Sequence, residues 1–298
     1  MLRFYRRLAT ALASVVVLTQ ATANAQTPVR ELPISREIPS YDCQVVRRNP
    51  EAYGTPKTAE EFNSRGLLRK DCKDKVGAIA DYTQAITLEP KSWGFYYNRG
   101  QTYASIGNFQ SAIVDFTVLI QLMPETEVAE AYVMRGYGRL LSNDQNGALQ
   151  DFKQAMSIGS TSRGAIGFGL TKLLTGDAEG AAQAFNGKFP QSERNPRANQ
   201  ASDLSFDPIV ILMREIAERA TTQQASNAAF RLGVREAIYG IAAYYLGNDS
   251  AAIRVRAAIE HFQQGRETDI VQMLIPLYNQ RINSECWWTG KTCIGAIR

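Results

Sequence analysis

Apolar and small residues recur through residues 59–162 in a helical pattern that returns three times with a period close to 34 residues. Each copy contains an arginine followed by glycine, at Gly66, Gly100 and Gly136, and each continues into an alanine-containing stretch with an aromatic residue. A single helix pair cannot bury such an apolar face by itself, so the repetition predicts pairs of helices that stack on one another.

The copy around Gly100 shows how the pattern divides into two helices. Gly107 and Asn108 interrupt it, and both residue types tolerate the positive φ angles of a tight turn. Pro124 follows the second apolar stretch, which a proline cannot continue as a helix. We therefore predict helices over 94–106 and 109–122, with small residues where they cross.

Weaker copies extend the pattern toward the C-terminus, over about 162–195 and 233–266. Between them, Asp207 and Pro208 have the composition of a helix start, and the apolar run after them predicts a buried helix. A capping helix is expected over 270–278. The predicted organisation is a signal peptide (1–25), an N-terminal extension (26–58), four repeats (59–195), a loop with a buried helix (196–232), and a degenerate repeat with a capping tail (233–298).

The period and the residue order resemble those of the tetratricopeptide repeat (TPR) family. The resemblance is strongest over 59–162. It implies an all-α, right-handed solenoid of antiparallel helix pairs, whose first helices line a concave face that holds an extended peptide or a helix of another protein. The style of the repeats also resembles that of exported bacterial members of the family.

An arginine and an aspartate recur 16 residues apart in the first three copies and are both absent from the last two. Residues that appear and disappear together suggest a pair across the two helices, although a row of arginines that binds an anion is the alternative. The predicted ion pairs are Arg65–Asp81, Arg99–Asp115 and Arg135–Asp151. The corresponding positions are Phe168 and Ala184 in the fourth copy, and Tyr239 and Val255 in the last.

The resemblance also places residues on the concave face. The candidate protein-binding residues are Asn63, Tyr97, Asn98, Gln101, Val133, Tyr137 and Leu140. Of the residues that family members use to clamp a partner's C-terminal carboxylate, only Asn98 has a counterpart, so that ligand is not expected. An apolar peptide groove is one interpretation. The other is that the chain covers Val133 and Leu140 itself, with the helix that begins at Asp207.

The N-terminus has the composition of a secretory signal peptide. Three arginines precede an apolar run, and Ala23-Asn24-Ala25 is a cleavage pattern that would leave Gln26 as the new N-terminus. The expected location is the bacterial periplasm, with secretion as the second possibility. Without residues 1–25 the charge balance is 30 basic against 29 acidic residues, which disfavours nucleic-acid binding. No later segment has the length and hydropathy of a transmembrane helix.

Four cysteines remain after the expected cleavage, namely Cys43, Cys72, Cys286 and Cys293. An even number in an exported chain suggests two disulfides, and four cysteines allow three pairings. We favour pairing of neighbours, Cys43 with Cys72 and Cys286 with Cys293. Zinc coordination is the alternative, disfavoured because there is no C-x-x-C motif.

Candidate catalytic groups are scarce. The one histidine, His261, lies in a predicted helix, and the sequence contains no nucleotide-binding loop or zinc-protease motif. We therefore expect a non-enzymatic protein-binding scaffold without cofactors. A self-associating surface protein is the main alternative, and a cell-wall hydrolase with two acidic residues is a lesser one.

Overall fold

The computed structural model describes residues 43–49, 54–124, 126–159, 162–187, 207–222 and 226–279. The chain divides into two units, residues 1–42 and Cys43–Arg298, and every described residue belongs to the second. Within the described residues all regular elements are helices, which confirms the predicted all-α class.

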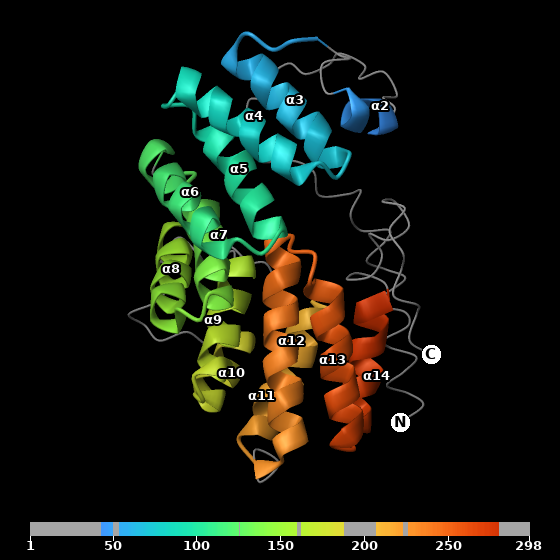
Figure 1. The fold of residues 1–298 in the computed structure, drawn as a ribbon. Coiled ribbons are helices and arrows are strands. Elements are labelled where there is room, and N and C mark those ends of the chain that lie inside the picture. The colour runs from blue at the N-terminus through green and yellow to red at the C-terminus, as the bar shows by residue number, and fades with distance from the viewer. Residues whose placement is uncertain are drawn as a thin grey trace, which may run out of the picture. The chain divides into compact units, whose positions relative to one another are not determined.

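From α3 to α10 the helices follow one another with short connections (Figure 1). Their bounds are α2 Cys43–Arg48, α3 Ala59–Asp71, α4 Lys75–Leu88, α5 Trp93–Ser105, α6 Phe109–Leu122, α7 Ala129–Leu141, α8 Gln145–Ile158, α9 Ser162–Leu174, α10 Ala178–Phe185, α11 Pro208–Ala220, α12 Ala228–Leu246, α13 Ala251–Gln264 and α14 Thr268–Leu277. Four successive pairs from α3 to α10 pack as antiparallel hairpins, and each hairpin packs against the next. The helices α12 and α13 form a further pair, and α14 packs against α13 and α11.

The turn inside the second repeat is built from one left-handed residue and one capping residue. Gly107 has a φ of 84°, as the sequence predicted, but Asn108 has a φ of −82°. The predicted turn is present, and Asn108 contributes to it as the N-cap of α6, whose side chain accepts a hydrogen bond from the Ser111 backbone N–H. Asp74, Asp144 and Asp177 cap the second helices of the other repeats in the same way.

Glycines sit where the two helices of a repeat cross. A Cβ on Gly100 would lie 2.8 Å from the Phe116 ring, and one on Gly136 would lie 2.8 Å from the Phe152 ring. These contacts leave no room for a side chain, so the recurring spacing of glycine and aromatic residue sets the distance between the helices. A Cβ on Gly167 of α9 would lie 2.4 Å from the Phe152 ring, so this glycine brings the fourth repeat against the third.

Of the C-terminal helices, α11 begins where the sequence predicted and α12 begins earlier. Asp207 caps α11, Pro208 is its first residue, and the run from Ile209 to Met213 is largely buried. The helix α12, however, begins at Ala228 rather than near 233, because Asn227 supplies its N-cap.

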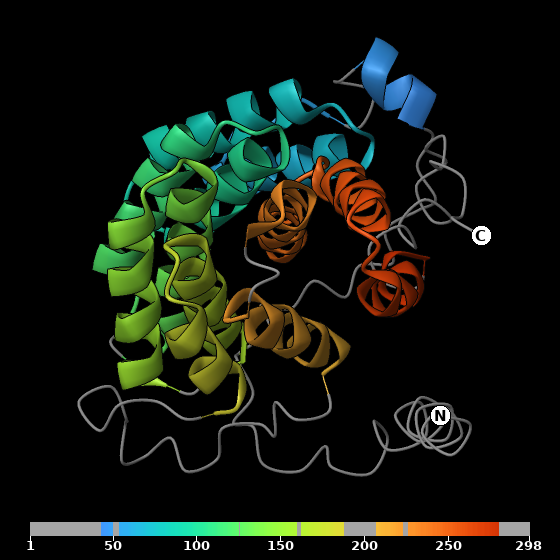
Figure 2. The same cartoon turned by 90° about the horizontal axis from the view of Figure 1, so that it is seen from below.

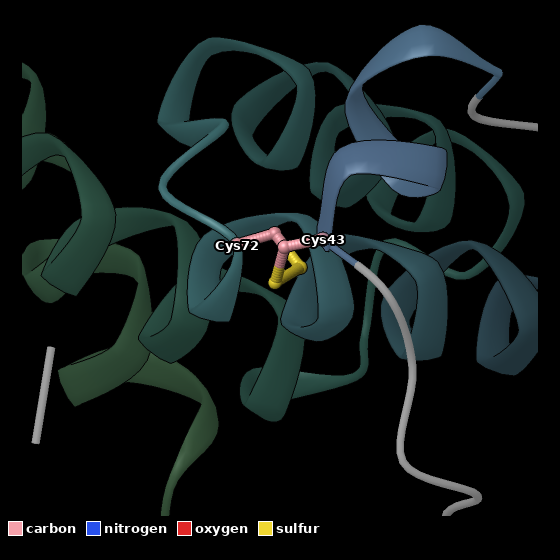
Figure 3. The surroundings of a disulfide bond; sticks show 2 residues. All are labelled: Cys43 and Cys72. Atoms are coloured by element: carbon pink, nitrogen blue, oxygen red, sulfur yellow. A yellow bond between two sulfur atoms is a disulfide. The ribbon is translucent and has the colours of Figure 1, made fainter. Parts of the chain in front are cut away.

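The short helix α2 is joined to the first repeat by a disulfide between Cys43 and Cys72 (Figure 3). Cys72 is the C-cap of α3 and is 1% exposed, and Val46 of α2 is also buried. The disulfide therefore attaches α2, which belongs to the predicted N-terminal extension, to the first repeat. The described residues do not include Cys286, Cys293, the predicted signal peptide or residues 188–206, with which the predicted fourth repeat ends and the predicted loop begins.

Candidate functional site

The inner face of the repeats consists of one side of the first helix of each pair, α3, α5, α7 and α9. Figure 2 shows the helices from α3 to α10 as an arc, with α12 on its inner side. The helix α12 packs directly against α7, α9 and α5. Much of the surface on which the sequence placed a partner is therefore occupied by the chain's own helix.

Val133, Tyr137 and Leu140 are fully buried, so their prediction as protein-binding residues was wrong. The Tyr137 ring stacks on Tyr245 of α12 at a centroid distance of 5.4 Å, and its hydroxyl donates a hydrogen bond to the Arg163 backbone oxygen at 2.7 Å. These contacts make Tyr137 a core residue whose one polar atom is satisfied inside the protein.

The alternative that the chain covers this surface itself is confirmed, but the covering helix differs from the expected one. The helix that begins at Asp207, α11, packs mainly against α10 and α14 instead. The covering helix α12 is apolar on several sides, with a fully buried run at 241–243 next to Gly240. Small residues allow close approach of helices, so this run is the signal that could have identified α12 as the covering element.

The turn after α12 is anchored on the end of α5. Asn248 Nδ2 donates to the Ala104 backbone oxygen at 2.6 Å, and the Asp249 backbone N–H donates to the Ser105 oxygen at 3.3 Å. Carbonyl groups in the last turn of a helix lack partners within that helix. The connection after α12 therefore supplies hydrogen-bond donors to two such carbonyl groups of α5. Lys75 Nζ also lies 2.6 Å from Asp249 Oδ2 and ties the turn to the start of α4.

The remaining predicted binding residues lie on α3 and α5 and are half-buried. Asn98 Nδ2 donates to Asn63 Oδ1 at 2.8 Å, which joins the inner faces of the first and second repeats. Gln101 Nε2 donates to the Tyr97 hydroxyl at 2.8 Å. Each amide group keeps donor or acceptor capacity beyond its one bond. The structure thus pairs Asn63 with Asn98 and Tyr97 with Gln101 and leaves all four half-buried, whereas Val133, Tyr137 and Leu140 belong to the buried core.

A charged pair marks the boundary between the half-buried and the covered parts of the inner face. Glu130 of α7 pairs with the Arg163 guanidinium of α9, and the same guanidinium donates to the backbone oxygen of Tyr245. Burial raises the pKa of Glu130, and Arg163 offsets part of the rise. Burial also raises the pKa of Tyr97, and the Glu130 charge raises it further, so Tyr97 lies at this boundary.

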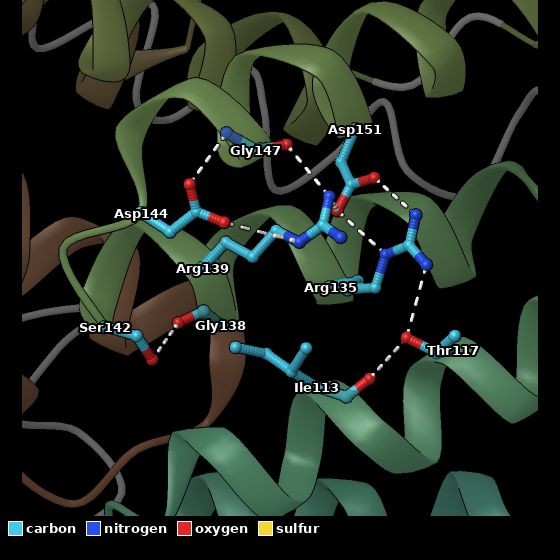
Figure 4. Close-up of polar contacts among 9 residues, drawn as sticks. All are labelled: Ile113, Thr117, Arg135, Gly138, Arg139, Ser142, Asp144, Gly147 and Asp151. Atoms are coloured by element: carbon cyan, nitrogen blue, oxygen red, sulfur yellow. Dashed lines mark hydrogen bonds and ion pairs between the residues drawn. The ribbon is translucent and has the colours of Figure 1, made fainter.

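All three predicted ion pairs are present in the structure. Arg135 Nη2 and Nε donate to the two oxygens of Asp151 at 2.7 and 2.9 Å (Figure 4). The pairs Arg65–Asp81 and Arg99–Asp115 have the same two-pronged geometry. With both carboxylate oxygens engaged in each pair, the structure favours a packing role for these arginines over an anion-binding row.

Arg99 and Arg135 also form hydrogen bonds that the sequence did not predict. Arg135 Nη1 also donates to Thr117 Oγ1 of α6 at 3.2 Å, and Arg99 Nη1 donates to Thr83 Oγ1 of α4 at 3.1 Å. These bonds reach the preceding repeat, so both arginines orient neighbouring repeats as well as the two helices of one pair.

Sequence reasoning missed a second arginine at two of these sites. Arg139 Nη1 lies 3.0 Å from Asp151 Oδ2 and donates to the Gly147 oxygen at 3.2 Å (Figure 4). Arg69 occupies the same place beside Asp81, 3.1 Å from Oδ2. Both follow the first arginine by four residues, one helical turn, and this spacing was the available signal.

Comparison with known proteins adds an independent observation. Residues 94–125, which contain most of α5 and all of α6, match the family model described as tetratricopeptide repeat. The chain contains a tetratricopeptide repeat. The TPR segment includes the Arg99–Asp115 pair and three of the half-buried inner-face residues, Tyr97, Asn98 and Gln101.

Similar proteins match this chain over part of their own length. BBSome complex member BBS4 of Xenopus tropicalis is 24% identical over 58% of this chain and 33% of its own length. Hsc70-interacting protein 1 of Drosophila melanogaster is 31% identical over 36% of this chain and 29% of its own. The chain thus spans about a third of these relatives. A solved TPR protein from Parabacteroides merdae is 16% identical, with a TM-score of 0.48 over 78% of this chain and 89% of that chain.

His261 lies in α13, outside the TPR segment, and is half-buried. Its Nδ1 atom is buried without a hydrogen-bond partner among the described residues.

No group of three His, Cys, Asp or Glu residues within the described ranges has the arrangement of a metal site. Across the same ranges, no helix has the length and hydropathy that crossing a membrane requires.

Proposed function

We propose that this protein is a non-enzymatic binding scaffold that holds a segment of another protein on the inner face of α3 and α5. The observation that carries the proposal is the group of half-buried amide and hydroxyl side chains on these two helices, Asn63, Tyr97, Asn98 and Gln101. Amide side chains can bond the backbone of an extended peptide in either direction, because each offers both donors and an acceptor.

The covered part of the inner face defines how large the bound segment is. Because α12 covers the inner face of α7 and part of that of α9, a partner on the inner face contacts mainly the first two repeats. The bound segment is therefore short, and Tyr97 is the aromatic side chain on which it packs. The TPR match over 94–125 supports this class of function, since repeat solenoids offer extended surfaces for binding.

A photoreactive residue tests the position of the partner. We expect p-benzoylphenylalanine at Gln101 to cross-link a discrete partner in the native host, because this position lies on α5 among the proposed contacts. The matched control is the same residue at Val114, which is 56% exposed on α6, outside the inner face. Cross-linking to the same partners from both positions, or from Val114 alone, would contradict the proposed site.

Substitution tests the chemistry of the same site. Replacing Asn98 and Gln101 together by alanine is expected to weaken the cross-linked partner's affinity by about tenfold, since two hydrogen bonds of about 0.5 to 1.5 kcal/mol each are lost. Isothermal titration with the identified partner measures this change, and thermal unfolding checks that the fold is kept. An unchanged affinity would place the partner elsewhere.

We further propose that the scaffold acts in the bacterial envelope, with secretion into the medium as the second location. The signal-peptide pattern of residues 1–25 and the Cys43–Cys72 disulfide support this location, since disulfides persist in oxidising compartments. We expect protein from the native envelope to begin at Gln26 and to carry Cys43 and Cys72 as one cross-linked peptide. Intact-mass and non-reducing peptide mass spectrometry measure both. A start at Met1 with free thiols would exclude export.

A further inference from the structure

A second surface, on α12 and α13, has an excess of arginine. Arg235 is 54% exposed and Arg254 is 38% exposed, and both side chains approach Glu236. Arg254 Nη1 lies 3.3 Å from Glu236 Oε2, and Arg235 Nη2 lies 3.6 Å from Oε1. One carboxylate is thus shared by two guanidinium groups, which leaves a net positive charge at this place.

The exposed arginines of these helices differ in their pairing from those of the first three repeats. The arginines Arg65, Arg99 and Arg135 of the first three repeats are each paired with a buried aspartate, and they are at most 17% exposed. The helices α12 and α13 instead contain four arginines, Arg231, Arg235, Arg254 and Arg256, against two acids, Glu236 and Glu260. Their net charge is therefore +2, on helices that reach the surface.

The cluster is held in place by an aromatic residue. The Arg254 guanidinium lies over the Tyr239 ring, 5.4 Å from its centroid. The Tyr239 hydroxyl in turn lies 3.5 Å from Asn143 Oδ1, in the turn between α7 and α8. Because Arg254 is already oriented by these contacts, little side-chain freedom remains to be lost when a ligand binds it.

The same face of α12 also offers an apolar contact. Leu232 is 38% exposed and lies one helical turn before Glu236, close to Arg235 in the sequence. A surface with guanidinium groups, a tyrosine and an exposed leucine has the composition of a protein interface, in which arginine and tyrosine are enriched. We name Leu232, Arg235, Glu236, Tyr239 and Arg254 the arginine surface.

We propose that the arginine surface docks an acidic peptide segment of a partner protein. Carboxylates of that segment accept hydrogen bonds from the guanidinium N–H groups that Glu236 does not engage. Apolar side chains of the same segment pack on Leu232. Arginine donates two parallel hydrogen bonds to a carboxylate, so the two arginines can hold successive acidic side chains. The surface lies on α12 and α13, apart from the α3–α5 inner face, and would give the scaffold a second binding site.

The size of the cluster favours a peptide over a nucleic acid or a membrane. Nucleic-acid binding draws on roughly six to ten phosphate contacts, and here two arginines share a single carboxylate. Binding to anionic membranes likewise needs clusters of about four to eight basic residues. Arg231 and Arg256 are not part of the arginine surface, which contains two arginines. Two guanidinium groups beside an apolar contact match a short run of acidic and apolar side chains.

The test is fluorescence anisotropy of the full chain with a labelled peptide of alternating glutamate and leucine. We expect saturable binding at about 50 mM salt that weakens several-fold at about 300 mM, because exposed charge pairs are screened. The double variant Arg235→Ala, Arg254→Ala should bind at least about tenfold more weakly. Glu236→Gln should bind about threefold more tightly, since it frees both guanidinium groups.

The matched control is Arg256→Ala, an exposed arginine on α13 that pairs with Glu260 instead. Its affinity should stay within about twofold of the wild type. The Asn98→Ala, Gln101→Ala variant should also bind the acidic peptide normally, which separates this surface from the inner-face site. Circular dichroism verifies that each variant keeps its helical content.

Two results would overturn the proposal. One is acidic-peptide binding that the double variant leaves unchanged, or that Arg256→Ala reduces as much. The other is tighter binding of single-stranded DNA or of phosphatidylglycerol vesicles than of the peptide, with that binding lost in the double variant.

Discussion

Replacing Tyr137 by alanine is expected to lower the free energy of unfolding by about 3 to 5 kcal/mol, the cost of removing a large aromatic ring from a packed core. The Tyr137 side chain is fully buried between α7 and α12. Its ring lies 5.4 Å from the Tyr245 centroid and 4.9 Å from that of Phe152, so its loss leaves a cavity lined by two aromatic residues. Urea denaturation monitored by circular dichroism measures the change.

Tyr137→Phe is the matched control for this prediction. It keeps the ring and removes only the hydroxyl that donates to the Arg163 backbone oxygen, so we expect a loss of about 1 kcal/mol. The comparison separates packing from hydrogen bonding. If Tyr137→Ala were as stable as the wild type, the tyrosine would lie on an open surface and α12 would not cover α7.

Replacing Asp115 by alanine is expected to cost about 3 to 5 kcal/mol, because it leaves the Arg99 guanidinium without its carboxylate in a largely buried position. Asp115 is 1% exposed and accepts two hydrogen bonds from Arg99, at 2.7 and 2.9 Å. Burial raises the pKa of Asp115, and Arg99 offsets part of that rise. The desolvation of the carboxylate therefore cancels much of the attraction within the pair.

A double variant distinguishes the cost of an unpaired charge from the net value of the pair. The fourth repeat carries Phe168 and Ala184 in these positions, both buried and apolar. We expect Arg99→Phe combined with Asp115→Ala to be at least about 2 kcal/mol more stable than Asp115→Ala alone, since no buried charge is left unpaired. Urea denaturation of the wild type, Asp115→Ala, Arg99→Phe and the double variant completes this double-mutant cycle. A double variant less stable than Asp115→Ala would show that the pair itself contributes most of the stability.

The ion pairs could be predicted because they depend on spacing within one helix pair. Once the sequence places two antiparallel helices around a short turn, residues 16 apart on facing sides come together, as Arg65 and Asp81 do. The second arginine, Arg139, lies one helical turn after Arg135, so its contact with Asp151 could have been predicted in the same way. Local periodicity also predicted the turn glycine Gly107 and the helix start at Asp207, because capping and backbone conformation depend on neighbouring residues.

The binding face could be predicted only in part. Asn63 and Asn98 belong to adjacent repeats, and the repeat register brings them within hydrogen-bonding distance. Tyr137 occupies the position of its repeat that Gln101 occupies in the second, yet it is buried against Tyr245, a residue more than 100 positions later in the chain. Nothing in the sequence around Tyr137 separates an aromatic residue that holds a partner from one that packs against its own chain.

The sequence by itself determined the helix pairs, their turns, their crossing glycines and the arginine–aspartate pairs, because each follows from contacts within one or two adjacent repeats. Only the tertiary structure decided that α12 fills the inner face at α7, that the turn at Asn248 closes on the end of α5, and that α12 and α13 present their arginines at the surface. These features depend on which of several apolar helices packs on an unoccupied face. That choice is made by the fit of whole surfaces distant in sequence, and the small residues at 240–243 indicate only that α12 can approach another helix closely, not which face it fills.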